Sequence, residues 1–288
     1  MKTLAGIVLY NPKIERLKEN IAAIEKQVDC LLFIDNASEN FEDFTNIIPP
    51  QSINIRNEKN RGVATALNQI CQYALDNNYE WALTLDQDSV VASNLISTYK
   101  QVLASNEHLG IICCKIRDRN YVTNDENLTC DRYVKGCFTS ASWVNIKAWR
   151  EVGGFDDSMF IDRVDYDFCM TLWKAGWGIY KTVKTEILHE LGKTRMVKLF
   201  GKPFTSTNHQ PFRYYYIYRN YIYESRKFPS TLLGALYILL TTSCIVWLHE
   251  KQKIAKTMNM IRGTWDGLTC PMWKPTPRVK ANRKNNES

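Results

Sequence analysis

The sequence has little of what marks a disordered, collagen-like or disulfide-stabilised protein. Its 288 residues include only 13 glycines and 9 prolines, and 45% of them are hydrophobic, which is an ordinary globular composition. The nine cysteines are an odd number and form no C-x-x-C pair, and no cleavable signal precedes the strand-like run at Leu4–Tyr10. We therefore expect reduced thiols and a cytoplasmic protein.

A glycine-rich phosphate loop is also missing. Neither G-x-G-x-x-G nor G-x-x-x-x-G-K-S/T occurs in the chain, which argues against a dinucleotide-dependent dehydrogenase. A diphosphate bound by this protein would therefore need a metal ion to balance its charge.

Positive charge is scarce in the first two thirds of the chain and concentrated in the last third. Residues 1–188 hold 20 Lys and Arg against 25 Asp and Glu, whereas residues 189–288 hold 17 against 5. The basic part indicates an anionic partner, such as phosphate, nucleic acid or an anionic membrane face. Because no recognisable nucleic-acid-binding motif is present and the acidic part would repel phosphate, we expect no nucleic-acid partner.

Short apolar runs alternate with amphipathic segments over the first 116 residues. Strands are predicted at 4–10, 30–34, 53–56, 81–85 and 110–116, and helices at 12–28, 62–77 and 95–103. This alternation predicts an α/β fold with a mostly parallel, Rossmann-like sheet flanked by helices on both faces. Ligands of such sheets gather at the carboxyl ends of the strands. Polar clusters fall at those ends, namely Tyr10-Asn11, Asp35-Asn36 and Asp86-Gln87-Asp88.

The composition changes further along the chain. A looser middle part contains a predicted helix at 165–175 and an extended segment at 179–188 that delivers His189. From residue 201 the chain is aromatic, basic and predicted to be helical, and residues 228–249 carry no formal charge. Residues 271–288 are predicted to be a basic, disordered tail.

Asp86 and Asp88 end a predicted buried strand, and side chains two positions apart in an extended chain face the same way. Two carboxylates on one edge suit Mg²⁺ or Mn²⁺ held jointly with substrate phosphates. The alternative is a solvated turn after a strand.

Three other features allow a functional and a purely structural interpretation. Asp162, Asp165 and Asp167 are either a second reactive cluster or N-terminal caps of the helix that follows. His189 is either a metal ligand or a partly buried histidine at a strand end, and Asn60-Arg61-Gly62 can be an ordinary turn.

Taken in order, these motifs resemble the family 2 glycosyltransferases of the GT-A fold, in particular a bacterial rhamnosyltransferase-like branch. The resemblance spans roughly residues 4–270 and rests on a series of short motifs. They are Val8–Pro12, Asp35–Ser38, Asn60–Ala64 with Asn68, Leu85–Ser89, Val152–Asp156, Met159–Phe168, Leu188–Gly192, Tyr214–Asn220 and Gly263–Gly267.

The resemblance implies a role for each matching position. The donor-binding residues would be Tyr10, Asn11, Asp35, Asn36, Asn60, Gly62, Asn68 and Asp86. Asp86, Asp88 and His189 would hold Mn²⁺ or Mg²⁺, and Asp165 would be the catalytic base. Thr171 stands where the family usually has an arginine, which leaves open how the diphosphate or the active-site loop is steadied.

The resemblance also implies domains and a reaction. Residues 1–200 would form the catalytic domain, with nucleotide-sugar binding in 1–116 and acceptor binding in 117–200, followed by a membrane-proximal helical extension at 201–270. The reaction would be inverting transfer from a nucleoside diphosphate sugar, with dTDP-L-rhamnose favoured, to a saccharide or lipid-linked saccharide in bacterial surface polysaccharide synthesis. A galactosyl or galactofuranosyl transferase and an inactive scaffold of a polysaccharide-assembly complex are the alternatives.

The basic, aromatic extension leads us to expect a peripheral protein on the inner face of the cell membrane. An uncharged stretch at 228–249 between Tyr- and Arg-rich and Lys-rich segments is typical of an in-plane anchor on anionic lipid. Core helices, a membrane span or the interface of a homo-oligomer are the alternatives.

Overall fold

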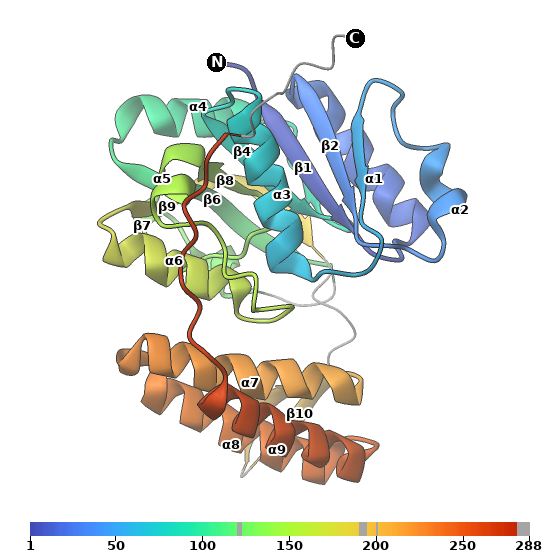
Figure 1. Cartoon of the computed structure of the whole chain (residues 1–288), viewed down its shortest axis with the longest axis vertical. Helices are drawn as coiled ribbons and strands as arrows, with labels where there is room; N and C mark the ends of the chain where they lie inside the picture. The colour runs from blue at the N-terminus through green and yellow to red at the C-terminus, as the bar shows by residue number, and fades with distance from the viewer. Residues whose placement is uncertain (120–122, 190–194, 200, 281–288) are drawn as a thin grey trace.

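The computed structural model describes residues 1–119, 123–189, 195–199 and 201–280 (Figure 1). An α/β part with one nine-stranded sheet occupies one end of the molecule, and three long helices occupy the other. Within the described residues the strands run in the order β3-β2-β1-β4-β8-β6-β9-β5, and β7 pairs with β9.

The first half of the sheet is parallel, as the sequence predicts. Its strands are β1 (Leu4–Leu9), β2 (Cys30–Asp35), β3 (Ile53–Arg56) and β4 (Trp81–Asp86). The helices of this half are α1 (Ile14–Ile24) with the 3-10 turn η1 (Glu25–Gln27), α2 (Phe41–Thr45) and α3 (Val63–Asp76). Alternate residues of β1 enter different cores, so that Leu4 packs toward α3 and Ile7 toward α1.

The second half of the sheet is mixed, because the middle of the chain contributes antiparallel strands. Its strands are β5 (Val90–Val91), β6 (Leu109–Asp118), β7 (Arg132–Tyr133), β8 (Ser142–Asn145) and β9 (Gly178–His189). Its helical segments are α4 (Leu95–Ser105), η2 (Asn124–Asn127), α5 (Ile146–Glu151) and α6 (Val164–Lys174). β8 lies between β4 and β6, antiparallel to both, and buries Trp143 completely.

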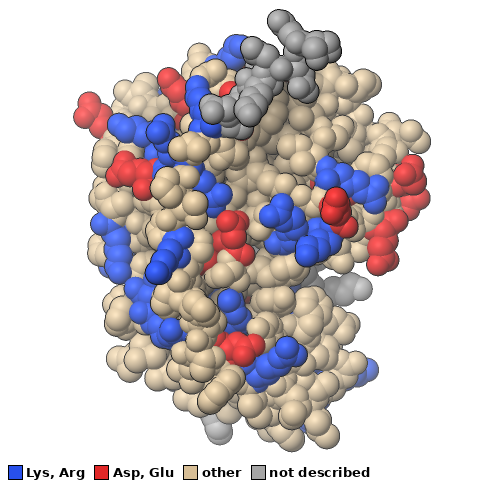
Figure 2. All heavy atoms as spheres, in the orientation of Figure 1, with Lys and Arg blue, Asp and Glu red and all other residues tan. Residues whose placement is uncertain are grey.

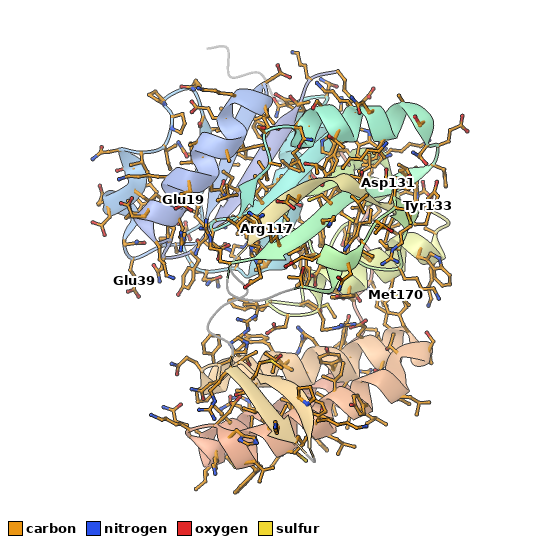
Figure 3. All side chains as sticks on the ribbon, turned by 180° about the vertical axis from the view of Figure 1, so that it is seen from behind. Glu19, Glu39, Arg117, Asp131, Tyr133 and Met170 are labelled. Carbon is orange, nitrogen blue, oxygen red and sulfur yellow. The ribbon has the colours of Figure 1, made fainter. Side chains whose placement is uncertain are left out.

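The C-terminal part contains α7 (Pro211–Lys227), η3 (Pro229–Thr231), α8 (Leu232–His249) and α9 (Lys253–Thr269), with a hairpin of β10 (Arg195–Leu199) and β11 (Lys202–Ser206) beside them. α7 lies between the α/β part and the other two helices (Figure 1). Seen from behind, the hairpin lies with the helices and not with the main sheet (Figure 3).

Two glycines explain how closely α9 packs on α7. A β-carbon at Gly263 would lie 2.3 Å from the carbonyl oxygen of Tyr215, and one at Gly267 would lie 2.6 Å from that of Arg219. Because the two glycines are four residues apart, they share one face of α9 and let the two backbones touch.

A buried polar cluster joins the three helices. The Lys256 ammonium pairs with Glu250 at 2.8 Å, and the Tyr214 hydroxyl donates to the same carboxylate at 2.5 Å. Loss of one partner of such a buried pair destabilises a fold by about 3–5 kcal/mol.

The predicted disordered tail is wrong for residues 271–280, which lie extended across the α/β part. Arg278 donates to the carbonyl oxygen of Gly153 at 2.9 Å and pairs with Asp157 at 3.1 Å. The backbone N–H of Trp273 donates to the Tyr223 hydroxyl at 2.7 Å. Residues 281–288 of that prediction lie outside the described residues.

Candidate functional site

A cleft of about 970 Å³ opens at the carboxyl ends of the parallel strands, between the sheet and α7–α8. Eight residues that were given a site role from the sequence line it, namely Tyr10, Asn36, Asn60, Gly62, Asp86, Asp88, Asp165 and His189, and so does Asp162 of the second acidic cluster. Loops that follow different strands thus deliver their polar side chains to one place, as expected of a parallel sheet.

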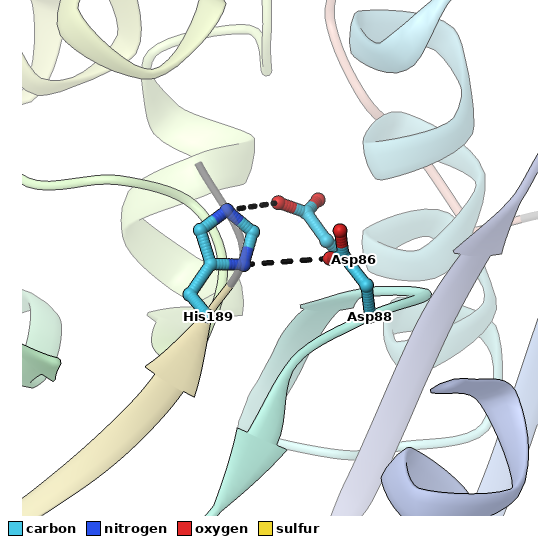
Figure 4. Close-up of side chains that lie close together, drawn as sticks. All are labelled: Asp86, Asp88 and His189. Carbon is cyan, nitrogen blue, oxygen red and sulfur yellow. Dashed lines mark ion pairs between the residues drawn. The ribbon is translucent and has the colours of Figure 1, made fainter. Parts of the chain in front are cut away.

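Asp86, Asp88 and His189 form a cluster in which one ligand atom from each lies within 4.8 Å of the others (Figure 4). The Nε2 atom of His189 is 3.9 Å from Oδ2 of Asp86, and its Nδ1 is 3.4 Å from Oδ1 of Asp88. Two carboxylates and an imidazole are a donor set that suits Mn²⁺ as well as Mg²⁺. The residues therefore fit a divalent cation.

The imidazole of His189 is oriented by a serine that the sequence analysis did not single out. The hydroxyl of Ser89 is 2.9 Å from Nδ1 of His189, and it is also 2.7 Å from the hydroxyl of Ser140. A hydrogen bond at Nδ1 leaves Nε2 to face Asp86, and outer partners of this kind orient metal-binding histidines in many proteins. The sequence feature that could have identified Ser89 is its position directly after Asp88.

Asp165 belongs to the first turn of α6 and lines the same cleft. Burial raises the pKa of its carboxyl group to about 7, although hydrogen bonds from backbone N–H groups act in the opposite direction. A carboxylate with a pKa near neutrality is suited to accept a proton at physiological pH.

The loop before α6 has an unusual backbone. Asp162 and Arg163 have φ values of 66° and 67°, so two consecutive residues with β-carbons are left-handed. Each such residue carries about 1–3 kcal/mol of strain and persists only where the surroundings enforce it.

Gly62 connects this loop to the predicted donor side. Its φ is 82°, and a β-carbon there would lie 2.5 Å from the carbonyl oxygen of Phe160. The same carbonyl accepts a hydrogen bond from Val63 at 2.7 Å. Asn60 caps the Gly62 N–H at 2.9 Å, and Asn36 donates to the Gly62 carbonyl at 3.2 Å. Glycine is needed here for both its conformation and the close approach.

Asn11 and Asp35 are not among the residues that line the cleft. The side-chain oxygen of Asn11 accepts a hydrogen bond from Glu39, and the Asp35 carboxylate caps the N–H of Ser38 and lies 3.3 Å from Arg56. They shape the loops beside the cleft, and their contact with a donor stays a prediction.

Asn68, which was predicted to lie against the donor, is buried and is not among the residues that line the cleft, so its contact with a donor stays a prediction. Its amide donates to the Phe155 carbonyl at 2.8 Å and to Asp157 at 2.7 Å. Its oxygen accepts from the Trp149 indole and from the N–H of Phe155, both at 2.9 Å. Buried in this way, Asn68 fastens α3 to the turn at residues 153–155, because every polar atom of its side chain is already bonded inside the fold.

The side chain of Thr171, at the position where the family usually has an arginine, forms a hydrogen bond within its own helix. Its hydroxyl donates to the Asp167 carbonyl on the preceding turn of α6 at 2.8 Å. Any steadying of the Asp165 loop must therefore involve other residues.

The second wall of the cleft comes from the C-terminal part and was not predicted from the sequence. Among its residues are Asn208, His209, Arg213 and Tyr221 on the polar side, and Ile238 and Ile245 of α8 on the apolar side. Arg213 forms an ion pair with Asp162 at 3.0 Å. Burial lowers the pKa of His209 to about 4, so this side chain is neutral at pH 7. No short motif marks these positions, because folding alone brings them to the sheet.

Comparisons with known proteins agree with this arrangement. The chain is 25% identical to the dTDP-rhamnosyl transferase RfbF of Shigella flexneri, over 92% of this chain and 94% of that protein. Its fold is similar to that of residues 1–349 of TarS from S. aureus, with a TM-score of 0.60 at 13% identity over 93% of this chain and 81% of the other. It is also similar to a mannosyltransferase of Pyrobaculum calidifontis solved with GDP-Man and Mn²⁺, with a TM-score of 0.58 at 13% identity over 93% and 87% of the two chains.

The family model of glycosyl transferase family 2 matches residues 5–155, which is more than half of the chain. This match confirms the family that the motifs resemble, and the similar structures confirm the GT-A fold. The chain therefore belongs to glycosyl transferase family 2.

Proposed function

We propose that this protein transfers a sugar from a nucleoside diphosphate donor, in the first place dTDP-L-rhamnose, to a hydroxyl group of a saccharide or lipid-linked saccharide, with inversion. The observation that carries the proposal is that Asp165 shares one cleft with the Asp86–Asp88–His189 cluster. The rhamnosyl transferase relative supports the choice of donor, since the two chains align over nearly their whole lengths.

The donor would lie along the carboxyl ends of β1, β2 and β4. Tyr10 and Asn36 would contact the nucleoside, and Asn60 and Gly62 would face the sugar diphosphate. Asp86, Asp88 and His189 would hold Mn²⁺ or Mg²⁺, which neutralises charge on the diphosphate when it is bound.

In the proposed reaction the acceptor hydroxyl attacks the anomeric carbon from the side opposite the diphosphate. The carboxylate of Asp165 takes the proton of that hydroxyl, and the nucleoside diphosphate leaves with the electron pair of the broken bond. The leaving group needs no proton, so one base is enough, whereas most glycosidases use two carboxyl groups.

An inactive scaffold of a polysaccharide-assembly complex is the second candidate. It would keep the fold but would have no need for a cluster of two carboxylates and an imidazole in which Ser89 orients the histidine, or for a carboxyl group with a pKa of about 7. These features favour the enzyme.

A panel of donors tests the proposal. Purified protein with Mn²⁺ or Mg²⁺ is incubated with dTDP-L-rhamnose, UDP-galactose or UDP-galactofuranose, and the released nucleoside diphosphate is measured, with Asp165→Asn as the matched control. Release from dTDP-L-rhamnose by the wild type alone supports the proposal. Faster release from a galactosyl donor corrects the sugar, and no release from any donor with either metal contradicts the transferase.

We also propose that the protein works at an anionic membrane surface, where a lipid-linked acceptor would be found. One described helix, Pro229–His249, is long and apolar enough to cross a membrane by length and composition, and 22% of its apolar window is buried. Yet α8 is fixed to α7, because the Tyr218 hydroxyl lies 2.7 Å from both the Leu239 carbonyl oxygen and the Ser243 hydroxyl. A crossing helix would have to leave these contacts, so an in-plane position is favoured.

α9 enlarges the apolar surface that α8 presents. Ile254, Met258, Ile261, Trp265 and Leu268 recur at spacings of three and four and are all more than half exposed. The exposed apolar side chains of α8 include Leu233, Leu236, Tyr237, Leu240, Trp247 and Leu248. We call these residues of α8 and α9 the C-terminal apolar surface. The end of the molecule formed by these helices carries few charged side chains on the face seen in Figure 2. Lys251, between the two helices, and Lys253, the first residue of α9, could contact anionic headgroups.

A further inference from the structure

The loop that leads into Asp165 is held from α7, an element outside the part of the chain that the family model matches. That match ends at residue 155, whereas the loop begins directly afterwards and α7 spans Pro211–Lys227. The two left-handed residues Asp162 and Arg163 lie in this loop, three and two residues before the proposed base.

Asn220 holds the backbone of the loop. This side chain is fully buried, and its amide donates to the carbonyl oxygens of Ile161 at 2.8 Å and of Asp162 at 2.9 Å. Both donor hydrogens of one amide are thus used on successive carbonyls where the backbone turns left-handed. Such a conformation, unfavourable for residues with a β-carbon, persists because the surroundings fix it.

Glu224 holds the side chain of Arg163, the residue that follows Asp162. The Glu224 carboxylate is 1% exposed and accepts hydrogen bonds from both Nε and Nη2 of Arg163, at 2.5 and 2.6 Å. The guanidinium carbon also lies 4.4 Å from the ring centre of Tyr166 and 4.6 Å from that of Tyr221. A bidentate pair between two aromatic rings fixes the direction as well as the position of the arginine.

Arg163 is the N-cap residue of α6, so its position determines where the helix starts and where Asp165 points. Asn220 and Glu224 are four residues apart and lie on one face of α7. Two further contacts join α7 to residues on either side of the loop. The Tyr223 hydroxyl forms a hydrogen bond with Asp156 at 2.7 Å, and Lys227 forms an ion pair with Asp167 at 2.7 Å. The loop is therefore held on both sides of the proposed base.

We infer that Asn220 and Glu224 are positioning residues, which act through Arg163 and the loop backbone to aim the Asp165 carboxylate at the acceptor hydroxyl. The inference rests on the proposed function, since it assumes that Asp165 is the base. It gives the C-terminal helix a part in catalysis and supplies the steadying contact that Thr171 does not make.

Glu224→Gln tests the inference, because it keeps the size of the side chain and removes the charge that pairs with Arg163. We expect kcat to fall by about 10–100-fold, as for a reacting group displaced by an ångström or less, while KM for the donor stays within about twofold. Asn220→Ala should act in the same direction and serves as the second variant if Glu224→Gln does not fold. Tyr215→Phe is the matched control, because it removes a 2.8 Å hydrogen bond from α7 to Asp266 of α9 and leaves the loop untouched.

Two readouts separate positioning from plain helix packing. Amide hydrogen exchange of a peptide covering residues 158–166 should be faster in Glu224→Gln and unchanged in Tyr215→Phe. In addition, Glu224→Gln should cost little further activity when Asp165 is already asparagine, because the two residues act as a unit.

The outcomes of these measurements are distinct. The inference is overturned if amide hydrogen exchange of the loop is unchanged in Glu224→Gln. It is also overturned if Glu224→Gln lowers activity as much in the Asp165→Asn background as in the wild type. Neither result contradicts the transferase. A wild type that releases nucleoside diphosphate from no donor overturns the proposed function and this inference together.

Discussion

The imidazole of His189, at the end of β9, faces the carboxylate of Asp86, at the end of β4, with Nε2 3.9 Å from Oδ2. The strands β8 and β6 lie between these two strands in the sheet, so only the folded sheet brings the residues together. Such a separation is a little longer than a hydrogen bond and leaves room for a cation to be coordinated by both atoms.

Replacing His189 should therefore change the metal requirement. We expect His189→Ala to raise the Mn²⁺ concentration needed for half-maximal nucleoside diphosphate binding by about 10–100-fold, and Ser89→Ala, which removes the contact to Nδ1, to raise it less. Isothermal titration with dTDP at several Mn²⁺ concentrations measures this. His108→Asn is the control, because His108 stacks on Trp177 away from the cleft and asparagine tolerates its positive φ of 56°. A metal dependence equal to that of the wild type would make His189 purely structural.

Asp165→Asn should reduce turnover without weakening the donor complex. Asparagine has nearly the same size but takes up no proton, so we expect kcat to fall by about 10²–10⁴-fold. In the wild type, kcat should rise with pH through about 7, because the carboxyl group has to lose its own proton before it can accept another. Initial rates between pH 5.5 and 8.5 measure both effects. If the residual kcat of Asp165→Asn still falls at low pH as the kcat of the wild type does, a group other than Asp165 causes the pH dependence.

The same pKa shift has a consequence for stability. The Asp165 carboxyl ionises near its ordinary value of 3.8 in the unfolded chain but near 7 in the fold. Stability from this group is thus fully present at low pH and is lost as the pH rises from about 4 to about 7. Asp165→Asn should melt higher than the wild type at pH 8, and by a smaller margin at pH 5. Asp43→Asn, at an exposed aspartate of α2, is the control. A Tm difference that does not vary with pH would mean that Asp165 is ionised throughout.

The buried hydrogen bonds of Asn68 predict a structural role for this side chain. Asn68→Ala leaves the Trp149 indole and the N–H of Phe155 without their acceptor. We expect a loss of about 2–4 kcal/mol in the free energy of unfolding, since each buried unsatisfied donor costs about 1–3 kcal/mol. Urea denaturation measures this, with Asn77→Ala at the C-cap of the same helix as a control of under about 1 kcal/mol. Unchanged stability with weakened dTDP binding would support the donor-binding role.

The parallel half of the sheet could be predicted because its strands and helices have clear periods of their own. β1 and α3 are found within two residues of where the hydrophobic pattern places them. β8 was missed because it lies in the middle of the chain, outside the regular alternation of strands and helices, and its burial comes from the neighbouring strands. Short antiparallel strands of this kind carry no local signal that separates them from loops.

The residues of the site were predictable to the extent that they follow strand ends. Asp86 and Asp88 could be paired from their spacing, and His189 from its place after an extended segment. The contacts of Asn220 and Glu224 could not, because they depend on how α7 docks on the loop before α6. α7 has seven aromatic residues among seventeen, a composition that is compatible with either a surface helix or a core helix. Its pattern does not reveal which polar side chains face another part of the chain.

Binding to anionic membranes should depend on the face of α9 that the sequence analysis did not assign. Deleting residues 228–288 would remove the helices packed on α7 together with the buried Glu250–Lys256 pair, so loss of binding by a truncated chain would not separate docking from unfolding. Substitutions on the exposed face avoid this difficulty. We expect Trp265→Ser with Ile261→Ser to reduce flotation with vesicles of phosphatidylglycerol and phosphatidylcholine by about tenfold or more, since each buried side chain of this size contributes about 1.5–3 kcal/mol.

The matched control for this prediction is Trp173→Ser, because Trp173 is a comparably exposed tryptophan, 51% against 66% for Trp265, but lies on α6 in the α/β part.

Added salt should weaken flotation of the wild type, because it screens the attraction of Lys251 and Lys253 to anionic headgroups. Wild-type protein that floats with neither anionic nor neutral vesicles would contradict membrane binding. Self-association that Trp265→Ser abolishes would instead identify the C-terminal apolar surface as an interface between two copies of the chain. Flotation lost equally in the Trp173 variant would show that the effect comes from general loss of apolar surface and not from α9.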